Sequence, residues 1–179
     1  RVAMVYQQFI NYPAMSVYDN IASPMRLMGK SVAEVDRAVR STAEMLKLTP
    51  LLQRKPLELS GGQQQRCALA RALVKGAGLV LLDEPLGALD ANLRGRMRNE
   101  LRAIRERLGV TFLHVTGSET EALAMGDRVV VLDRGRIIQS GTADQVYDTP
   151  ASPDVAHFLN RFNLFDGKLS SGSFSGQFG

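Results

Sequence analysis

The chain has 179 residues, of which 45% are hydrophobic and 22% are charged, and its net charge is +4. This composition is ordinary for one soluble globular domain with a sizeable core. The net charge is too small to indicate DNA binding. No apolar run approaches the roughly 20 residues of a membrane-spanning helix. The single cysteine, Cys67, excludes an internal disulfide and is expected to be a buried structural thiol, and two histidines with one cysteine make no zinc site without clustered carboxylates.

The first part of the chain is predicted to contain a strand followed by helices. Residues 2–6 are apolar and strand-like, and they lead into a polar loop at Gln7 and Gln8. Residues 16–54 are mainly helical by the spacing of their apolar side chains, and Asp19 is expected to cap the first short helix.

A capping box marks the next helix, and strands alternate with helices after it. Ser31 lies three residues before Glu34, the spacing at which the two residues cap a helix start reciprocally. The further predicted helices are residues 62–73, 92–108, 119–125, 142–147 and 153–162. The further predicted strands are residues 79–83, 110–116, 129–132 and 136–139, the last two joined by a hairpin-like turn at 133–135. This alternation predicts an α/β fold with a largely parallel core sheet.

The string from Leu59 to Arg66, LSGGQQQR, places a hydroxyl and two glycines at a predicted helix start. At Gly61 and Gly62 the backbone can approach a ligand closely, and the free N–H groups and the helix dipole favour an anion. Together with the hydroxyl of Ser60, they form a cradle suited to a phosphate group. A lone Ser-Gly-Gly would equally fit an ordinary turn and helix cap. The whole string resembles the signature motif of ABC ATPases.

Two adjacent acids, Asp83 and Glu84, follow the apolar run of residues 79–82. This is the carboxyl end of a predicted strand, where α/β proteins place their ligands. Asp83 is suited to hold Mg²⁺ directly or through water, and Glu84 is suited to position and polarise an attacking water. Acids are also common at helix starts, so helix capping is the alternative interpretation. In this order after the signature string, the segment resembles the Walker B strand and catalytic glutamate of ABC ATPases.

Two further segments resemble motifs of the same family. Residues 86–90 resemble the D-loop, which crosses the dimer interface in that family, and Asp90 matches its aspartate. A turn with Asp90 capping the next helix is the other interpretation, and the two are compatible. Residues 5–21 resemble the Q-loop and the start of the helical subdomain, so Gln7 matches the glutamine that reaches the metal and the water in the family. Gln8 is the neighbouring candidate.

The resemblance covers nearly the whole chain and implies the ATP-binding subunit of an importer-type ABC transporter. The implied fold is a P-loop NTPase of the ABC type, with a mainly parallel core sheet and an α-helical subdomain. Residues 1–162 would form part of the ATPase domain, with the helical subdomain at about 14–75. Residues 163–179 would begin a C-terminal β-barrel regulatory domain, because residues 165–169 resemble the first strand of that barrel.

The implied cofactors are ATP and Mg²⁺, with Asp83 and Gln7 as metal ligands and with Glu84 and Gln7 as catalytic residues. In this family the signature motif binds the nucleotide held by the other subunit. The residues expected to do so here are Ser60, Gly61, Gly62 and Gln63. The implied partners are a second ATPase subunit, transmembrane permease subunits and, indirectly, an extracytoplasmic solute-binding protein, with no nucleic acid. The expected location is peripheral, at the cytoplasmic face of the bacterial inner membrane.

The solute and the functional class leave alternatives open. Residues 7–13 and 20–24 look most like ATPases for sugars, polyols or glycerol phosphate, whereas residues 163–165 look as much like polyamine or metal importers. A carbohydrate or polyol is favoured. A soluble ABC ATPase acting on DNA or ribosomes is a second class. The compact helical subdomain opposes it, and so do residues 126–129, 135–141, 146–147 and 150, which look like the tail of importer ATPases. A degenerate regulatory subunit is a third class, which the intact pair Asp83 and Glu84 opposes.

The run of residues 111–122 resembles the switch region, with one departure. Where the family has His-Asp after the threonine, this chain has Gly117 and Ser118, so the side chain that normally contacts the γ-phosphate is missing. His114 lies three residues earlier, on the opposite face of the strand and roughly 10 Å away, and is expected to be a packing or surface residue. Three hypotheses follow: a slow subunit, pairing with a different subunit that carries the histidine, or replacement of the contact by another residue such as Ser118 or Glu119.

A second departure concerns the phosphate-binding loop. The sequence contains no Gly-x-x-x-x-Gly-Lys-Ser/Thr string, it starts at Arg1 directly before a strand, and it stops within a turn-rich β segment. We therefore interpret the sequence as a fragment truncated at both ends. Such a fragment alone is expected to bind ATP poorly and to be inactive.

Overall fold

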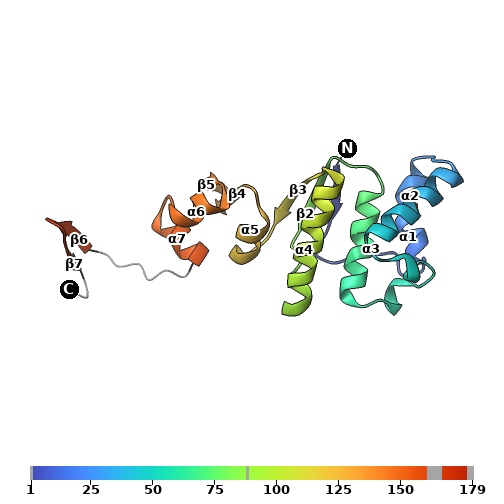
Figure 1. The fold of residues 1–179 in the computed structure, drawn as a ribbon, viewed down its shortest axis with the longest axis horizontal. Helices are drawn as coiled ribbons and strands as arrows, with labels where there is room; N and C mark the ends of the chain where they lie inside the picture. Colours follow the sequence, from blue (N-terminus) through green and yellow to red (C-terminus); the bar gives the residue numbers. More distant parts are fainter. Residues whose placement is uncertain (1, 88, 161–166, 177–179) are drawn as a thin grey trace. The chain divides into compact units, whose positions relative to one another are not determined.

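The structure is a computed structural model that describes residues 2–87, 89–160 and 167–176 (Figure 1). The chain divides into two compact units, an N-terminal unit of residues 1–117 and a C-terminal unit of residues 118–179. In both units helices and strands alternate along the chain, so the predicted α/β fold is confirmed.

The N-terminal unit is built on a three-stranded parallel sheet in the order β1-β2-β3. The strands are β1 (Val2–Val5), β2 (Leu79–Asp83) and β3 (Thr111–Val115). Ala3 and Val5 on β1 and Val80 and Leu82 on β2 are buried, because the sheet turns this face inward. The opposite face is apolar but exposed. Its exposed members are Val2, Met4, Leu113 and Val115.

Helices fill the long connection between β1 and β2. They are α1 (Val17–Leu27), α2 (Val32–Met45), two short 3₁₀ helices (Thr49–Leu51 and Pro56–Glu58) and α3 (Gly61–Leu73). Helix α1 packs against both α2 and α3, and α3 also contacts β1 (Figure 1). This helical layer therefore fixes the start of α3 relative to the end of β1.

Of the predicted caps of these helices, the one of α2 is confirmed and the one of α1 is wrong. Ser31 and Glu34 form the predicted capping box at the start of α2. The first helix, however, is capped by Ser16, whose Oγ accepts the Asp19 N–H at 3.0 Å, so the expectation that Asp19 is the cap was wrong. Asp19 lies in the first turn, where its carboxylate accepts a hydrogen bond from the Ser16 hydroxyl at 2.7 Å. Its negative charge also interacts favourably with the positive end of the helix dipole.

Helix α4 (Ala91–Leu108) follows β2 and ends at Gly109, which adopts a left-handed conformation with φ +60°. It buries Met97, Leu101 and Ile104, one apolar stripe at helical spacing.

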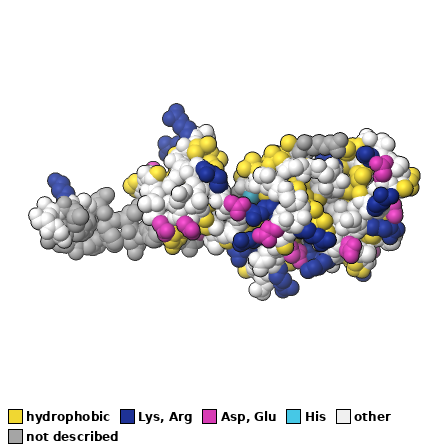
Figure 2. All heavy atoms as spheres, turned by 45° about the horizontal axis from the view of Figure 1, so that its top comes forward, with side chains coloured by type: hydrophobic (Ala, Val, Ile, Leu, Met, Phe, Trp, Pro, Cys, Tyr) yellow, Lys and Arg dark blue, Asp and Glu magenta, His cyan; other side chains and the backbone are white. Residues whose placement is uncertain are grey.

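Figure 2 shows Lys and Arg side chains interspersed with Asp and Glu side chains over the visible face, in keeping with the net charge of +4.

The C-terminal unit contains an antiparallel hairpin and three short helices. The hairpin strands are β4 (Val129–Asp133) and β5 (Arg136–Gly141), and the helices are α5 (Glu119–Met125), α6 (Ala143–Asp148) and α7 (Pro153–Asn160). Arg134 and Gly135 both have positive φ, which is the two-residue turn that a tight hairpin requires. The core of the unit consists of Val129, Val131, Val146, Val155 and Leu159.

The last described segment is a second antiparallel hairpin, β6 (Gly167–Ser170) and β7 (Ser173–Gly176). The boundary expected between residues 162 and 163 lies outside the described residues, and so do residues 163–166 and 177–179 of the expected regulatory domain. Among the helices that the structure describes, none combines the length and the apolar character needed to span a membrane.

Candidate functional site

The candidate site lies at the carboxyl edge of the parallel sheet, where three chain segments leave their strands together. Val5, Leu82 and His114 are register partners on β1, β2 and β3. Gln7 and Glu84 each lie two residues beyond such a partner, so the strand order brings the two predicted segments to the same edge. Loops at this edge are the usual place for ligands in open α/β sheets.

Glu84 is held in an uncommon backbone conformation by main-chain hydrogen bonds. Its φ is +46°, a value that few residues other than glycine adopt. Its N–H donates to the Val115 carbonyl at 2.9 Å, which extends the pairing of β2 and β3 by one residue, and its carbonyl accepts the Gly87 N–H at 3.1 Å. The structure therefore fixes the direction in which the half-buried Glu84 side chain leaves the sheet.

The Glu84 carboxylate reaches the segment that follows β3. Its Oε1 accepts the backbone N–H of Gly117 at 2.9 Å. The alternative interpretation of Glu84 as a helix cap does not hold, since Asp90 caps the next helix. The predicted switch position and the predicted water-positioning residue are thus in direct contact, although 33 positions separate them in the sequence.

The four signature residues occupy different environments at the start of α3. Ser60 is the N-cap residue, and Gln63 Oε1 accepts its N–H at 3.0 Å. Ser60 and Gly61 are exposed, and a Cβ built on Gly61 meets no atom within 4 Å. Gly62 is buried, and a Cβ there would lie 3.0 Å from Leu93 of α4. The open part of the motif is therefore Ser60 and Gly61, whereas Gly62 serves close packing.

Another residue of the signature string joins α3 to the segment after Glu84. The buried side chain of Gln65 donates a hydrogen bond to the Pro85 carbonyl. Sequence reasoning gave Gln65 no role. Ala68 and Leu69, three and four residues later on the helix, are apolar and buried, which could have indicated that Gln65 is buried too. A buried glutamine needs a polar partner.

Asp90 has the capping role that the sequence analysis allowed. Its Oδ1 accepts the Leu93 N–H at 2.9 Å at the start of α4. The residues before it are anchored by the buried side chains of Leu86 and Leu89. The role of Asp90 at a subunit interface remains a prediction.

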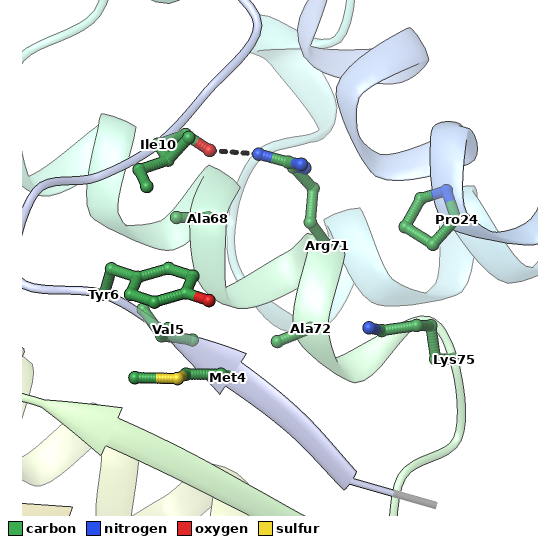
Figure 3. Close-up of a pocket in the computed structure, with 9 residues that line it drawn as sticks. All are labelled: Met4, Val5, Tyr6, Ile10, Pro24, Ala68, Arg71, Ala72 and Lys75. Atoms are coloured by element: carbon green, nitrogen blue, oxygen red, sulfur yellow. Dashed lines mark hydrogen bonds between the residues drawn. The ribbon is translucent and has the colours of Figure 1, made fainter.

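The loop after Gln7 is anchored by two residues that the sequence analysis did not single out. Asn20 is fully buried on α1, where its Oδ1 accepts the Tyr12 N–H at 2.7 Å and its Nδ2 donates to the Tyr12 carbonyl at 3.0 Å. The guanidinium carbon of Arg71 on α3 lies 4.3 Å from the centre of the Tyr12 ring. Arg71 also donates a hydrogen bond to the Ile10 carbonyl (Figure 3). Exposed Gln7 therefore precedes a loop whose far part is fixed to the helical layer.

A small cavity lies beside this loop. Its volume is about 120 Å³, smaller than the roughly 300 Å³ of the smallest typical ligand pockets. Figure 3 shows Arg71 on α3, Lys75 just after that helix and Tyr6 just after β1. The remaining lining residues are Met4, Val5, Ile10, Pro24, Ala68 and Ala72.

The two remaining reactive side chains lie on the inner side of the N-terminal unit. Cys67 is fully buried, as predicted, and burial raises its pKa to about 12. His114 is half-buried, and burial lowers its pKa, while the charge of Glu84 acts in the opposite direction. Burial therefore disfavours the charged form of each group.

Comparison with known proteins relates the chain to ATP-binding subunits of importers. The sequence model of the ABC transporter family matches residues 1–87. The trehalose/maltose import ATP-binding protein MalK of Thermococcus litoralis is 49% identical over 175 residues, which cover 97% of this chain and 47% of the relative. The sn-glycerol-3-phosphate import ATP-binding protein UgpC of Cupriavidus pinatubonensis is 49% identical over 158 residues, covering 88% and 43%.

A third relative is a polyamine importer subunit. The spermidine/putrescine import ATP-binding protein PotA of Shigella boydii is 45% identical over 165 residues, which cover 92% of this chain and 44% of the relative. The chain thus spans about half the length of the curated relatives it matches.

Proposed function

Because the chain belongs to the ABC transporter family of ATP-binding subunits, we propose that the full-length protein hydrolyses ATP to power the import of a solute. One observation carries the proposal. Asp83 ends β2 and Glu84 follows it, at the same edge of the sheet as the loop of Gln7, and Glu84 contacts the switch position Gly117. An acid pair at this edge of a parallel sheet fits phosphoryl transfer to water.

The residues at the edge fit a magnesium ion by their chemistry. Asp83 offers carboxylate oxygens and Gln7 an amide oxygen, the hard donors that Mg²⁺ prefers when nucleotide phosphates complete its shell. When bound, the ion would neutralise charge that develops on the phosphates. Glu84 would orient the attacking water and accept its proton.

Ser60 and Gly61 are proposed to bind the nucleotide of a second subunit. The open surface at Gly61 supports this role, since a Cβ there meets nothing within the chain. The N–H groups of the first turn of α3 and the positive end of the helix dipole favour a phosphate. Gln63 and Gly62 would shape this helix start, and Asp90 would lie at the same subunit interface.

The proposed architecture and setting follow the same reasoning. The helical layer between β1 and β2 supports a helical subdomain at about residues 14–75, and the hairpin of β6 and β7 supports the start of a regulatory β domain within residues 163–179. The proposed partners are permease subunits in the bacterial inner membrane, a second ATPase subunit and, through the permease, a solute-binding protein. Attachment at the cytoplasmic face would be peripheral.

The proposed solute is a carbohydrate, a polyol or glycerol phosphate. The names of two relatives, for trehalose/maltose and for glycerol-3-phosphate import, support this class. The name of the third relative keeps a polyamine as the alternative, with a metal ion beside it.

The test is reconstitution of the full-length protein with its membrane partners in lipid vesicles. Uptake of labelled maltose, glycerol-3-phosphate and spermidine would be measured together with ATP hydrolysis, and the Glu84→Gln variant would serve as the inactive control. ATP-dependent uptake of maltose or glycerol-3-phosphate supports the proposal, and uptake of spermidine selects the alternative. Hydrolysis without binding of membrane subunits, but with copurifying nucleic acid or ribosomes, would overturn the transport function.

A further inference from the structure

The Glu84 carboxylate lies between two glycines that leave room for it on both sides. Its Oε1 accepts the Gly117 N–H at 2.9 Å, and a Cβ built on Gly117 would lie 3.3 Å from the same oxygen. A Cβ built on Gly87 would lie 3.1 Å from Oε2. An alanine at either position would thus bring its Cβ into a tight contact with the Glu84 carboxylate.

Backbone conformation does not explain why glycine stands at these positions. Among the described residues, five glycines have positive φ, and neither Gly87 nor Gly117 is one of them. Their φ values therefore do not require glycine. What distinguishes glycine here is the missing Cβ next to the carboxylate of Glu84.

We propose that Gly117 is a positioning residue for Glu84, which acts through its backbone N–H where the family resemblance leads to the expectation of a histidine side chain. The inference rests on the proposed ATPase function and assigns a role to the departure in the switch region. The N–H fixes Oε1, the extra main-chain bond from Glu84 to Val115 fixes the backbone, and Oε2 is left for the water.

The first test compares Gly117→Ala with Gly95→Ala in the full-length protein. Alanine at 117 keeps the N–H, but its Cβ would lie 3.3 Å from Oε1, so the carboxylate would have to move by a few tenths of an ångström. Because displacement of a catalytic group by about 1 Å can cost about 100-fold in rate, we expect kcat for ATP hydrolysis to fall roughly 3-fold to 10-fold, with KM for ATP changed less than about twofold. Gly95 lies in α4 with nothing within 4 Å of an added Cβ, so its variant should keep the wild-type kcat.

The second test observes the contact without turnover. In the full-length protein labelled with ¹⁵N-glycine, Glu84→Ala removes the acceptor of the Gly117 N–H. The amide resonance of Gly117 should shift, and its proton should exchange faster with solvent, whereas the amide of Gly95 should be unchanged. The same spectrum reports whether the Gly117→Ala variant is folded.

The outcomes separate this inference from the proposed function. An unchanged kcat in a folded Gly117→Ala variant, or an unmoved Gly117 resonance in Glu84→Ala, overturns the positioning role while ATP hydrolysis stands. Absence of ATP hydrolysis in the wild-type protein with its partners overturns the proposed function instead, and the resonance test still decides whether Gly117 holds Glu84.

Discussion

At the scale of single residues, Glu84 is the side chain whose charge the proposed chemistry requires. In Glu84→Gln the side-chain oxygen can still accept the Gly117 N–H, so the substitution removes the charge and leaves the contact. We expect ATP binding by the full-length protein to persist and turnover to fall by about 10² to 10⁴. Equilibrium binding of a fluorescent ATP analogue and steady-state hydrolysis measure the two effects. Turnover near the wild-type rate would remove Glu84 from the mechanism.

Gly117→His tests what the missing histidine means. The new Cβ would press on Glu84 Oε1 from 3.3 Å, so we expect turnover to fall with the histidine installed. If the natural site merely lacked a donor, the histidine would restore an interaction worth about 10²–10³ in rate. Transport and hydrolysis measured together distinguish the two, and a rise of tenfold or more would identify a slowed natural site.

At the scale of elements, the start of α3 offers two adjacent glycines with opposite surroundings. Gly61→Leu adds a side chain in open space, so the monomer should fold and bind ATP normally, while ATP-driven dimerisation is blocked. Gly62→Ala places a methyl group 3.0 Å from the end of the Leu93 side chain. We expect this overpacking to outweigh the roughly 1 kcal/mol by which alanine favours a helix over glycine, so the unit should be destabilised by about 1 kcal/mol.

Light scattering with ATP and Mg²⁺ in a Glu84→Gln background measures dimerisation, and thermal unfolding measures stability. Loss of ATP binding by the Gly61→Leu monomer would show that the signature motif acts on the nucleotide of its own subunit. A normal melting temperature for Gly62→Ala would mean that Leu93 moves aside without cost.

Local pattern was sufficient to predict most of the helices and strands, although several of their ends differ by one or two residues and the two 3₁₀ helices were not predicted. The capping box at Ser31 and Glu34, the strand of residues 79–83 and the helix of residues 119–125 form where the sequence predicts them. The cap of the first helix was misassigned because Ser16 and Asp19 satisfy each other, and either residue suits a helix start by type alone.

The contacts of the candidate site could be predicted only in part. Motif order placed Asp83 and Glu84 at the end of a strand, since that depends on neighbouring residues alone. The bond from Gly117 to Glu84 depends on the register of β2 against β3, and the bond from Gln65 to Pro85 depends on how α3 packs. Such long-range geometry carries no local sequence signal.

At the scale of the whole molecule, stability is expected to depend on pH through the buried thiol of Cys67. Burial raises its pKa from 9.0 to about 12. Between these values the folded thiol keeps a proton that the unfolded chain has lost, so the contribution is fully present below about pH 9 and declines as the pH rises. The limiting slope is about 1.4 kcal/mol per pH unit.

Urea unfolding of the N-terminal unit at pH 8 to 11 measures this slope, and the Cys67→Ala variant provides the reference without a thiol. The difference in unfolding free energy between the two proteins should shrink from pH 9 upward. A difference that is constant with pH would show that the folded thiol ionises as readily as the unfolded one.

The parallel pairing of β1 with β2 also sets an order of events during synthesis. Val2 pairs with Leu79, and ribosomes add roughly 5–20 residues per second, so β1 waits on the order of several seconds for its neighbour. Meanwhile α1, α2 and α3 can bury their apolar stripes against one another, because their contacts join segments closer in sequence. The helical layer of the nascent chain should therefore form before β1 pairs with β2.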